Sequence, residues 1–195
     1  MSLVELIARA DERGLAAGGL ACLDRCVSLL GGDDEILRPL WAGLADGAEP
    51  EEWTTRLEQV RVKLQTDATD DTETTGEGGA EGEAVLLARR MLAAAPATRS
   101  AASVREWADA CSVAALRIHR LLDASATGAS SVDSFREGRT EGMPPLVEAE
   151  LRRQTRVLEL LAEHGAGGLR QAMAVSTEGR RVLRAVVSRR ARGRA

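Results

Sequence analysis

The feature that most limits the fold of this chain is its shortage of side chains that favour β-strands. Its 195 residues include no Tyr and a single Phe, Phe135, so a core must come from Leu, Ala and Val with three Trp. Clusters of aromatic and β-branched residues favour strands, whereas Ala and Leu cost little free energy in a helix. The composition therefore predicts helices before any periodicity is considered.

Apolar residues recur at helical spacing in the first third of the chain, which indicates four short helices. We expect Gly14 to end the first, Gly31 and Gly32 to close the second, Asp33 to cap the third and Pro50 to begin the fourth. The expected ranges are 2–12, 15–30, about 33–44 and about 50–64.

The same spacing returns after residue 83. The expected ranges are 83–95, 100–124, 144–165 and 169–190, the last either continuous or broken near residues 176–179. Residues 126–145 are irregular, with Phe135 as an anchor to the core. We therefore predict an all-α fold of about eight helices in one or two helical-bundle lobes, with no significant β-sheet.

Charge is distributed unevenly along the chain. The formal net charge of −4 is the sum of an acidic N-terminal part and a basic C-terminal part. Residues 66–82 contain acidic but no basic groups and no large apolar side chain, so they bury too little surface to repay the entropy of ordering. The sequence thus predicts an N-terminal helical lobe over 1–65, a flexible acidic linker over 66–82, and a C-terminal helical bundle over 83–195 with an Arg-rich end.

The three cysteines, Cys22, Cys26 and Cys111, are expected to be buried, reduced thiols, because their number is odd and their spacing is not that of a disulfide framework. The N-terminus carries acidic residues and no long apolar run, so we predict neither a signal peptide nor a membrane span. A cytoplasmic location is expected. Lys63 is the only lysine beside many arginines, which is typical of a GC-rich bacterial genome.

No motif for catalysis, a cofactor or a metal is present. Lys63 has no glycine-rich loop before it, and no G-x-G-x-x-G follows a predicted strand. His119 and His164 fall on different predicted helices, with His119 expected at the edge of a helix face, and Cys111 falls on an apolar stripe. We therefore expect no catalytic, cofactor-binding or metal-binding residue, and a chain that is not an enzyme.

One stretch of the sequence suggests a partner. Arginines are dense from Arg180 to Arg194, and Glu178 is the only acidic residue beside them. Such density can bind nucleic-acid phosphates or another anionic surface; it is also typical of a solvated helix end, where cations are favourable. The residues predicted as possible anion or nucleic-acid contacts are Arg180, Arg181, Arg184, Arg189 and Arg190.

Three functions remain open from the sequence. The first is a non-enzymatic protein-interaction or regulatory module, whose partner is another protein or a second copy of the chain, and not a membrane. The second is a nucleic-acid-associated protein that uses the Arg-rich C-terminal helix. The third is a helical bundle that binds a small molecule between its helices. A separate possibility is that the acidic linker and the front lobe fold back onto the basic C-terminal region and mask its arginines from nucleic acid.

Overall fold

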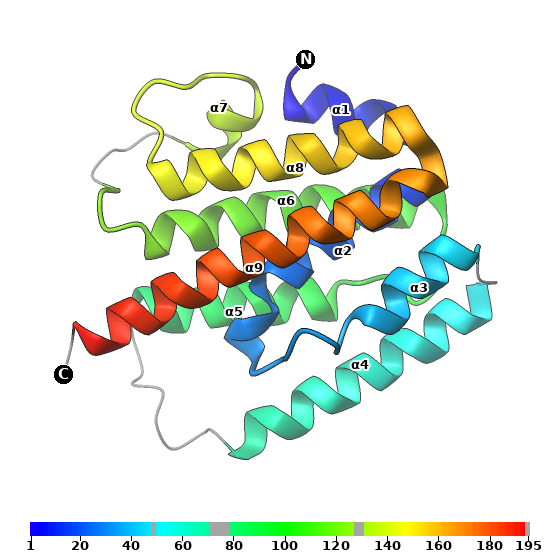
Figure 1. Ribbon diagram of the computed structural model, residues 1–195, viewed down its shortest axis with the longest axis horizontal. Helices are drawn as coiled ribbons and strands as arrows, with labels where there is room; N and C mark the ends of the chain where they lie inside the picture. The colour runs from blue at the N-terminus through cyan, green and yellow to red at the C-terminus, as the bar shows by residue number, and fades with distance from the viewer. Residues whose placement is uncertain (48–49, 71–78, 127–130, 194–195) are drawn as a thin grey trace.

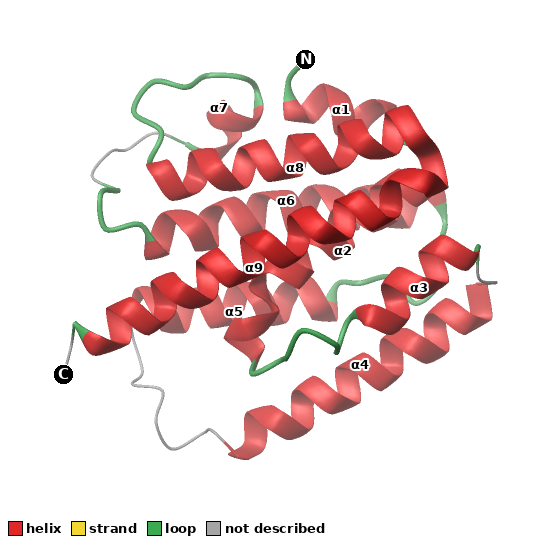
Figure 2. Ribbon diagram, viewed as in Figure 1, coloured by secondary structure: helices red, strands yellow, loops and turns green. Residues whose placement is uncertain are grey.

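The computed structural model describes residues 1–47, 50–70, 79–126 and 131–193, and within these ranges it contains helices, turns and loops but no strand (Figures 1 and 2). The all-α prediction is confirmed. The α-helices are α1 (Leu3–Arg9), α2 (Glu12–Cys26), α3 (Arg38–Asp46), α4 (Pro50–Asp70), α5 (Ala80–Ala93), α6 (Ala101–Leu122), α7 (Val132–Arg136), α8 (Pro145–His164) and α9 (Leu169–Arg192), with 3₁₀-helices η1 (Val27–Leu30) and η2 (Gly165–Gly168). None of the helices in the described ranges combines the length and hydropathy that a membrane span requires.

Helix α2 lies at the centre of the fold, in contact with α6, α8 and α9 (Figure 1). From Leu15 to Cys26 every residue except Gly18 is buried. A helix that is covered on all sides must present small side chains where its neighbours approach. Gly19 is such a position, because a Cβ there would lie 2.7 Å from the indole ring of Trp107 on α6.

Helices from both sides of the predicted linker share one hydrophobic core. Trp53 on α4 and Trp107 on α6 meet edge to face, with their ring centroids 6.3 Å apart. Each indole N–H is satisfied, since Trp53 donates to the carbonyl of Pro96 and Trp107 to that of Met91, both at 2.9 Å. The division into lobes stays a prediction, but the helices before and after residues 66–82 pack together.

Residues at both ends of that predicted linker are helical. Helix α4 runs to Asp70, and α5 begins at Ala80. Residues 71–78, the middle of the predicted flexible segment, lie outside the described residues.

Two predicted helix boundaries are wrong for a shared reason. The carboxylate of Asp11 accepts a hydrogen bond from the backbone N–H of Gly14 at 2.7 Å, so Gly14 lies in the first turn of α2 instead of ending α1. Asp33 accepts from the backbone N–H of Glu35 at 2.9 Å within a turn, and α3 begins only at Arg38. An aspartate can cap a helix or close a turn, and local sequence does not separate the two.

The later boundaries agree with prediction. The hydroxyl of Ser100 accepts from the backbone N–H of Ser103 and caps α6, and Gly165, whose φ is +52°, directly follows the last residue of α8. The last helix is continuous across residues 176–179. Phe135 is 1% exposed and anchors residues 131–145 in a small second core, as predicted, although the stretch that we expected to be irregular contains helix α7.

Arginines from distant segments close two helix C-termini. Arg61 donates to the carbonyl of Ala93 at 3.1 Å, at the end of α5, and Arg105 donates to the carbonyl of Ile7 at 2.8 Å, near the end of α1. The last carbonyls of a helix have no partner within it and carry partial negative charge, so a guanidinium both hydrogen-bonds and neutralises them.

Replacing Gly19 with Ala tests the close approach of α2 and α6. The added methyl would overlap the ring of Trp107, so we expect the free energy of unfolding to fall by about 1–3 kcal/mol in urea denaturation. Gly82 in α5 is the matched control, because among the described residues outside its own helix backbone no atom lies within 4 Å of its added Cβ. Gly82→Ala should raise stability by about 0.4–1 kcal/mol. Equal effects of the two substitutions would contradict this packing.

Candidate functional site

A buried ion pair joins α2 to α8. Arg25 and Glu150 both have fully buried side chains, and two parallel hydrogen bonds link them: Nε to Oε2 at 2.8 Å and Nη2 to Oε1 at 2.7 Å. Removing two charges from water costs several kcal/mol per ion, which is offset only when the geometry is good and the other polar atoms are satisfied. The surroundings of the pair therefore decide whether it is a structural or a reactive group.

The remaining polar atoms of the pair are held by a chain of hydrogen bonds. Gln154 donates from Nε2 to Oε1 of Glu150 at 2.8 Å, and the hydroxyl of Ser112 donates to Oε1 of Gln154 at 2.6 Å. Arg136 on α7 then donates from Nε to the same hydroxyl at 3.1 Å. We call these five residues, from Arg25 to Arg136, the buried network.

The pair is charged at neutral pH. Burial alone would raise the pKa of Glu150, but the guanidinium of Arg25 outweighs this effect and holds the pKa below its usual value. Burial likewise opposes the charge of Arg25, and the Glu150 carboxylate outweighs it and raises the pKa of Arg25. Glu150 is therefore a fixed anion and not a general acid or base near pH 7.

His119 lies beside this pair, fully buried, so the prediction that it sits at the edge of a helix face is wrong. Its Nδ1 is 2.7 Å from the carbonyl oxygen of Ala115, which can only accept, so Nδ1 carries the proton. Nε2 lies 3.5 Å from Oε2 of Glu150 and has no hydrogen-bond partner among the described residues. Burial lowers the pKa of His119 below 6.5, and the residue is neutral at pH 7.

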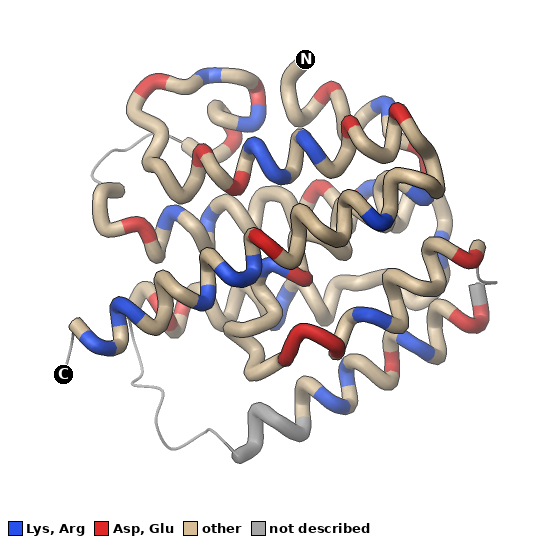
Figure 3. The backbone as a smooth tube through the Cα atoms, in the orientation of Figure 1, with Lys and Arg blue, Asp and Glu red and all other residues tan. Residues whose placement is uncertain are grey.

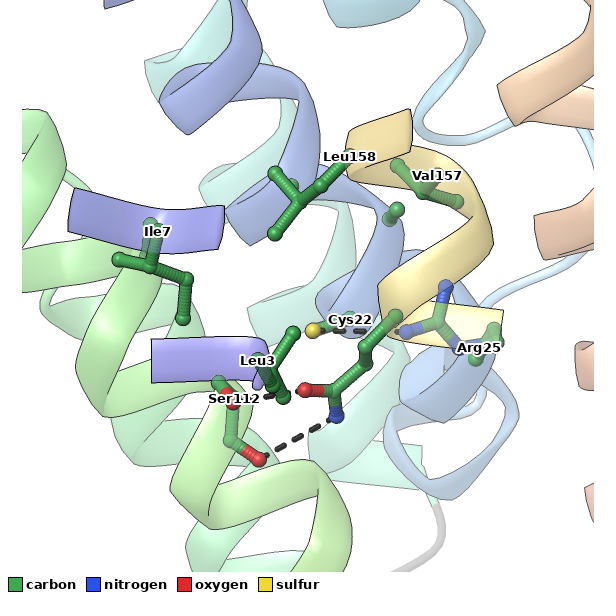
Figure 4. Close-up of a pocket in the computed structure, with 11 residues that line it drawn as sticks. Leu3, Ile7, Cys22, Arg25, Ser112, Val157 and Leu158 are labelled. Atoms are coloured by element: carbon green, nitrogen blue, oxygen red, sulfur yellow. Dashed lines mark hydrogen bonds between the residues drawn. The ribbon is translucent and has the colours of Figure 1, made fainter. Parts of the chain in front are cut away.

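The cavity beside the network is too small for a substrate. Figure 4 shows Leu3 and Ile7 of α1 on one side of it and Cys22 and Arg25 of α2 on the other. Its volume is about 10 Å³, at the lower limit for one water molecule. Burial also raises the pKa of the Cys22 thiol to about 12, which removes its nucleophilic form. The network is therefore a structural element.

The three cysteines are free and buried, as the sequence predicts. Among the described residues, no group of three or more His, Cys, Asp and Glu side chains is placed to hold a metal ion.

Three of the five predicted anion contacts have acidic partners, and in Arg180 and Arg190 the guanidinium is also at least partly buried. Arg180 is 4% exposed, forms an ion pair with buried Asp24, and has its Nε 3.0 Å from Oδ1 of Asp34. Arg190 has its Nε 3.4 Å from Oε1 of Glu81 and donates to the carbonyl that ends α6 at 3.3 Å. Arg180 is not available to an external anion, and Arg190 is partly occupied.

Gly179 explains why Arg180 is buried. A Cβ at this glycine would lie 2.4 Å from Cδ of Arg25, so only glycine lets α9 approach α2 this closely. At that approach the next side chain, Arg180, reaches Asp24. This glycine is the one local signal that distinguishes Arg180 from the neighbouring arginines.

The other predicted contacts point outward. Arg181 and Arg189 are exposed and have no ion pair with another described residue, and Arg192 shares both properties. Arg184 is exposed too, with Nη2 3.0 Å from Oδ1 of Asp34. Figure 3 shows basic positions, in blue, along α9. We call Arg181, Arg184, Arg189 and Arg192 the α9 arginine face.

Comparison with protein-family models, with curated proteins and with solved structures finds no match to this chain.

Replacing Glu150 with Gln tests the buried pair. The variant leaves the charge of Arg25 buried without its counterion, and we expect a loss of about 3–5 kcal/mol in the free energy of unfolding. The double variant Arg25→Met/Glu150→Leu removes both charges and should recover most of that loss, measured by the same denaturation. Glu159→Gln, at an exposed ion pair with Arg156, is the control and should cost less than about 1 kcal/mol. A double variant as unstable as Glu150→Gln would contradict this account.

His119 predicts a pH dependence of stability. Its pKa is lowered in the folded chain, so as the pH falls through about 6.5 the unfolded chain takes up a proton that the folded chain does not. The free energy of unfolding should therefore decrease between pH 7.5 and 5.5, while Glu150 stays ionised in this window. His119→Asn keeps a donor near Nδ1 and should flatten that slope; His164→Asn, at an exposed position, should leave it unchanged. A slope that survives His119→Asn would assign it to another group.

Proposed function

We propose that this chain is a non-enzymatic interaction module that binds an acidic surface of another protein through the α9 arginine face. The observation that carries the proposal is the division of roles on α9: Arg180 is neutralised inside the fold, whereas Arg181, Arg189 and Arg192 are exposed without acidic partners in the described residues. Exposed guanidinium groups are suited to bidentate contacts with carboxylates.

The spacing of these residues supports a linear contact. Arg181 and Arg192 are eleven residues apart, about three turns, so they project from nearly the same side of the helix at a separation of about 16 Å. Arg184 and Arg189 flank that line. Such a row matches acidic side chains spaced along a partner helix or strand.

The buried network supports a function without catalysis. Its titratable groups are either fixed in charge or removed from solvent, and its cavity excludes a substrate. What the chain offers to other molecules therefore lies on its surface.

Nucleic acid is the second candidate, because the same exposed arginines can contact phosphates. Four cations are few for this purpose, and no aromatic side chain lies on the α9 arginine face to stack with bases. A carboxylate-bearing protein surface needs neither a long row of charges nor stacking.

Photo-crosslinking in the native cell tests the proposal. A photoreactive residue at Ala185, exposed on α9, should form a specific protein adduct, and one at Ala102, exposed on α6, should not. Arg181→Ala/Arg189→Ala should abolish the adduct while changing the free energy of unfolding by less than about 0.5 kcal/mol, since neither residue has an ion pair in the described residues.

Four outcomes contradict the proposal. An adduct with nucleic acid would select the second candidate, and an adduct with a second copy would make the chain its own partner. An adduct that survives the double substitution would exclude the α9 arginine face. Identical adducts from Ala185 and Ala102 would show contact without specificity.

A further inference from the structure

A groove separates α3 from the segment where η2 leads into α9. Its volume is about 550 Å³, within the range of about 300–1,000 Å³ that is usual for small-ligand sites. Side chains from both walls line it, among them Arg38, Trp41 and Ala45 from α3 and Leu169, Arg170 and Met173 from α9. We call this the α3–α9 groove. It does not include any residue of the α9 arginine face.

The floor of the groove is apolar and the walls are low. Trp41 and Leu169 are 5% and 4% exposed, and Met173, which also lines the groove, is partly exposed. Ala42 and Ala45 on the α3 wall are exposed, and their short side chains leave the floor within reach of a guest. An indole ring and a flexible thioether adapt well to an aliphatic chain.

The charge of the groove has one sign. Among the described residues, Arg38 and Arg170 are its only charged lining residues, on a chain whose net charge is −4. Arg170 is exposed and has no ion pair with another described residue. Arg38 pairs with Glu35, but both side chains are largely exposed, and such a pair exchanges partners at little cost. One guanidinium on each wall is thus available to an anion.

A smaller cavity of about 240 Å³ continues the groove past Arg38, Trp41 and Met173. Its lining is polar and of mixed charge, with Asp34 and Arg181 among the contributing side chains. That polar lining, which includes Asp24, Asp34 and Glu35, does not suit an apolar chain, so an apolar guest is confined to the larger groove.

We propose that the α3–α9 groove binds a small amphiphilic carboxylate, of the class of medium-chain fatty acids. The aliphatic chain lies on Trp41, Leu169 and Met173, and the carboxylate pairs with Arg38 or Arg170. A small molecule fits better than a protein segment, because α3 has nine residues and spans only about 14 Å. A stable protein contact buries about 800 Å² on each partner, which is large for a groove wall only about 14 Å long.

Isothermal titration with decanoate, below the concentration at which it forms micelles, tests the proposal. We expect saturable binding at one site, and binding at least tenfold weaker for decyltrimethylammonium and for acetate. Arg38→Ala/Arg170→Ala should weaken decanoate binding at least tenfold, and Ala45→Trp should block the groove. Arg152→Ala, at an exposed position on α8, is the matched control and should bind decanoate as the parent chain does.

Several results would overturn the proposal: no saturable binding of decanoate, binding of decyltrimethylammonium as tight as that of decanoate, or unchanged decanoate binding in the double arginine variant. Binding of a synthetic acidic, leucine-containing peptide in place of decanoate would assign the groove to a protein segment. Thermal unfolding of each variant confirms its fold, and if Ala45→Trp does not fold, the double arginine variant decides.

Discussion

The way in which α8 and α9 pack on the central helix α2 depends on one interaction, the buried pair of Arg25 and Glu150. A guanidinium with no exposed surface is stable only if its carboxylate partner is fixed in place, and this requirement positions α8 against α2. It also requires Gly179, since any side chain there would meet Arg25. The long arginine side chain thus sets how closely both α8 and α9 approach the central helix.

The neighbouring residue of α2 extends the same constraint. Asp24 and Arg25 are consecutive, so they project about 100° apart around the helix. Asp24 pairs with Arg180 of α9 while Arg25 pairs with Glu150 of α8. These two charges interrupt the most apolar window of the sequence. In the structure they specify which helices pack on α2 and at which position along its axis. Apolar packing alone would allow the helices to slide past one another.

Much of the fold follows from the sequence because helix formation is local. Periodicity and the residues at helix ends predict where most helices lie. The predicted helix start is wrong where an aspartate closes a turn, as Asp33 does. The pairs that position the helices are separated by more than a hundred residues, and no local rule connects them. Glu150 and Gln154 do carry a signal: they follow Val147 by three and seven residues, in register with the apolar stripe of α8.

A count of charges in the sequence treats the arginines of α9 as equivalent. In the structure, some of their side chains face α2 and others face outward. Arginine side chains that face α2 form ion pairs inside the fold. Leaving a buried guanidinium unpaired would cost more free energy than a contact at the surface would gain. Only the outward side chains remain for a partner, and at the first turn of the same helix Arg170 faces a groove instead of an acid. One face of α9 therefore packs in the bundle. The same helix carries both proposed contacts, one for an acidic protein surface and one for a carboxylate.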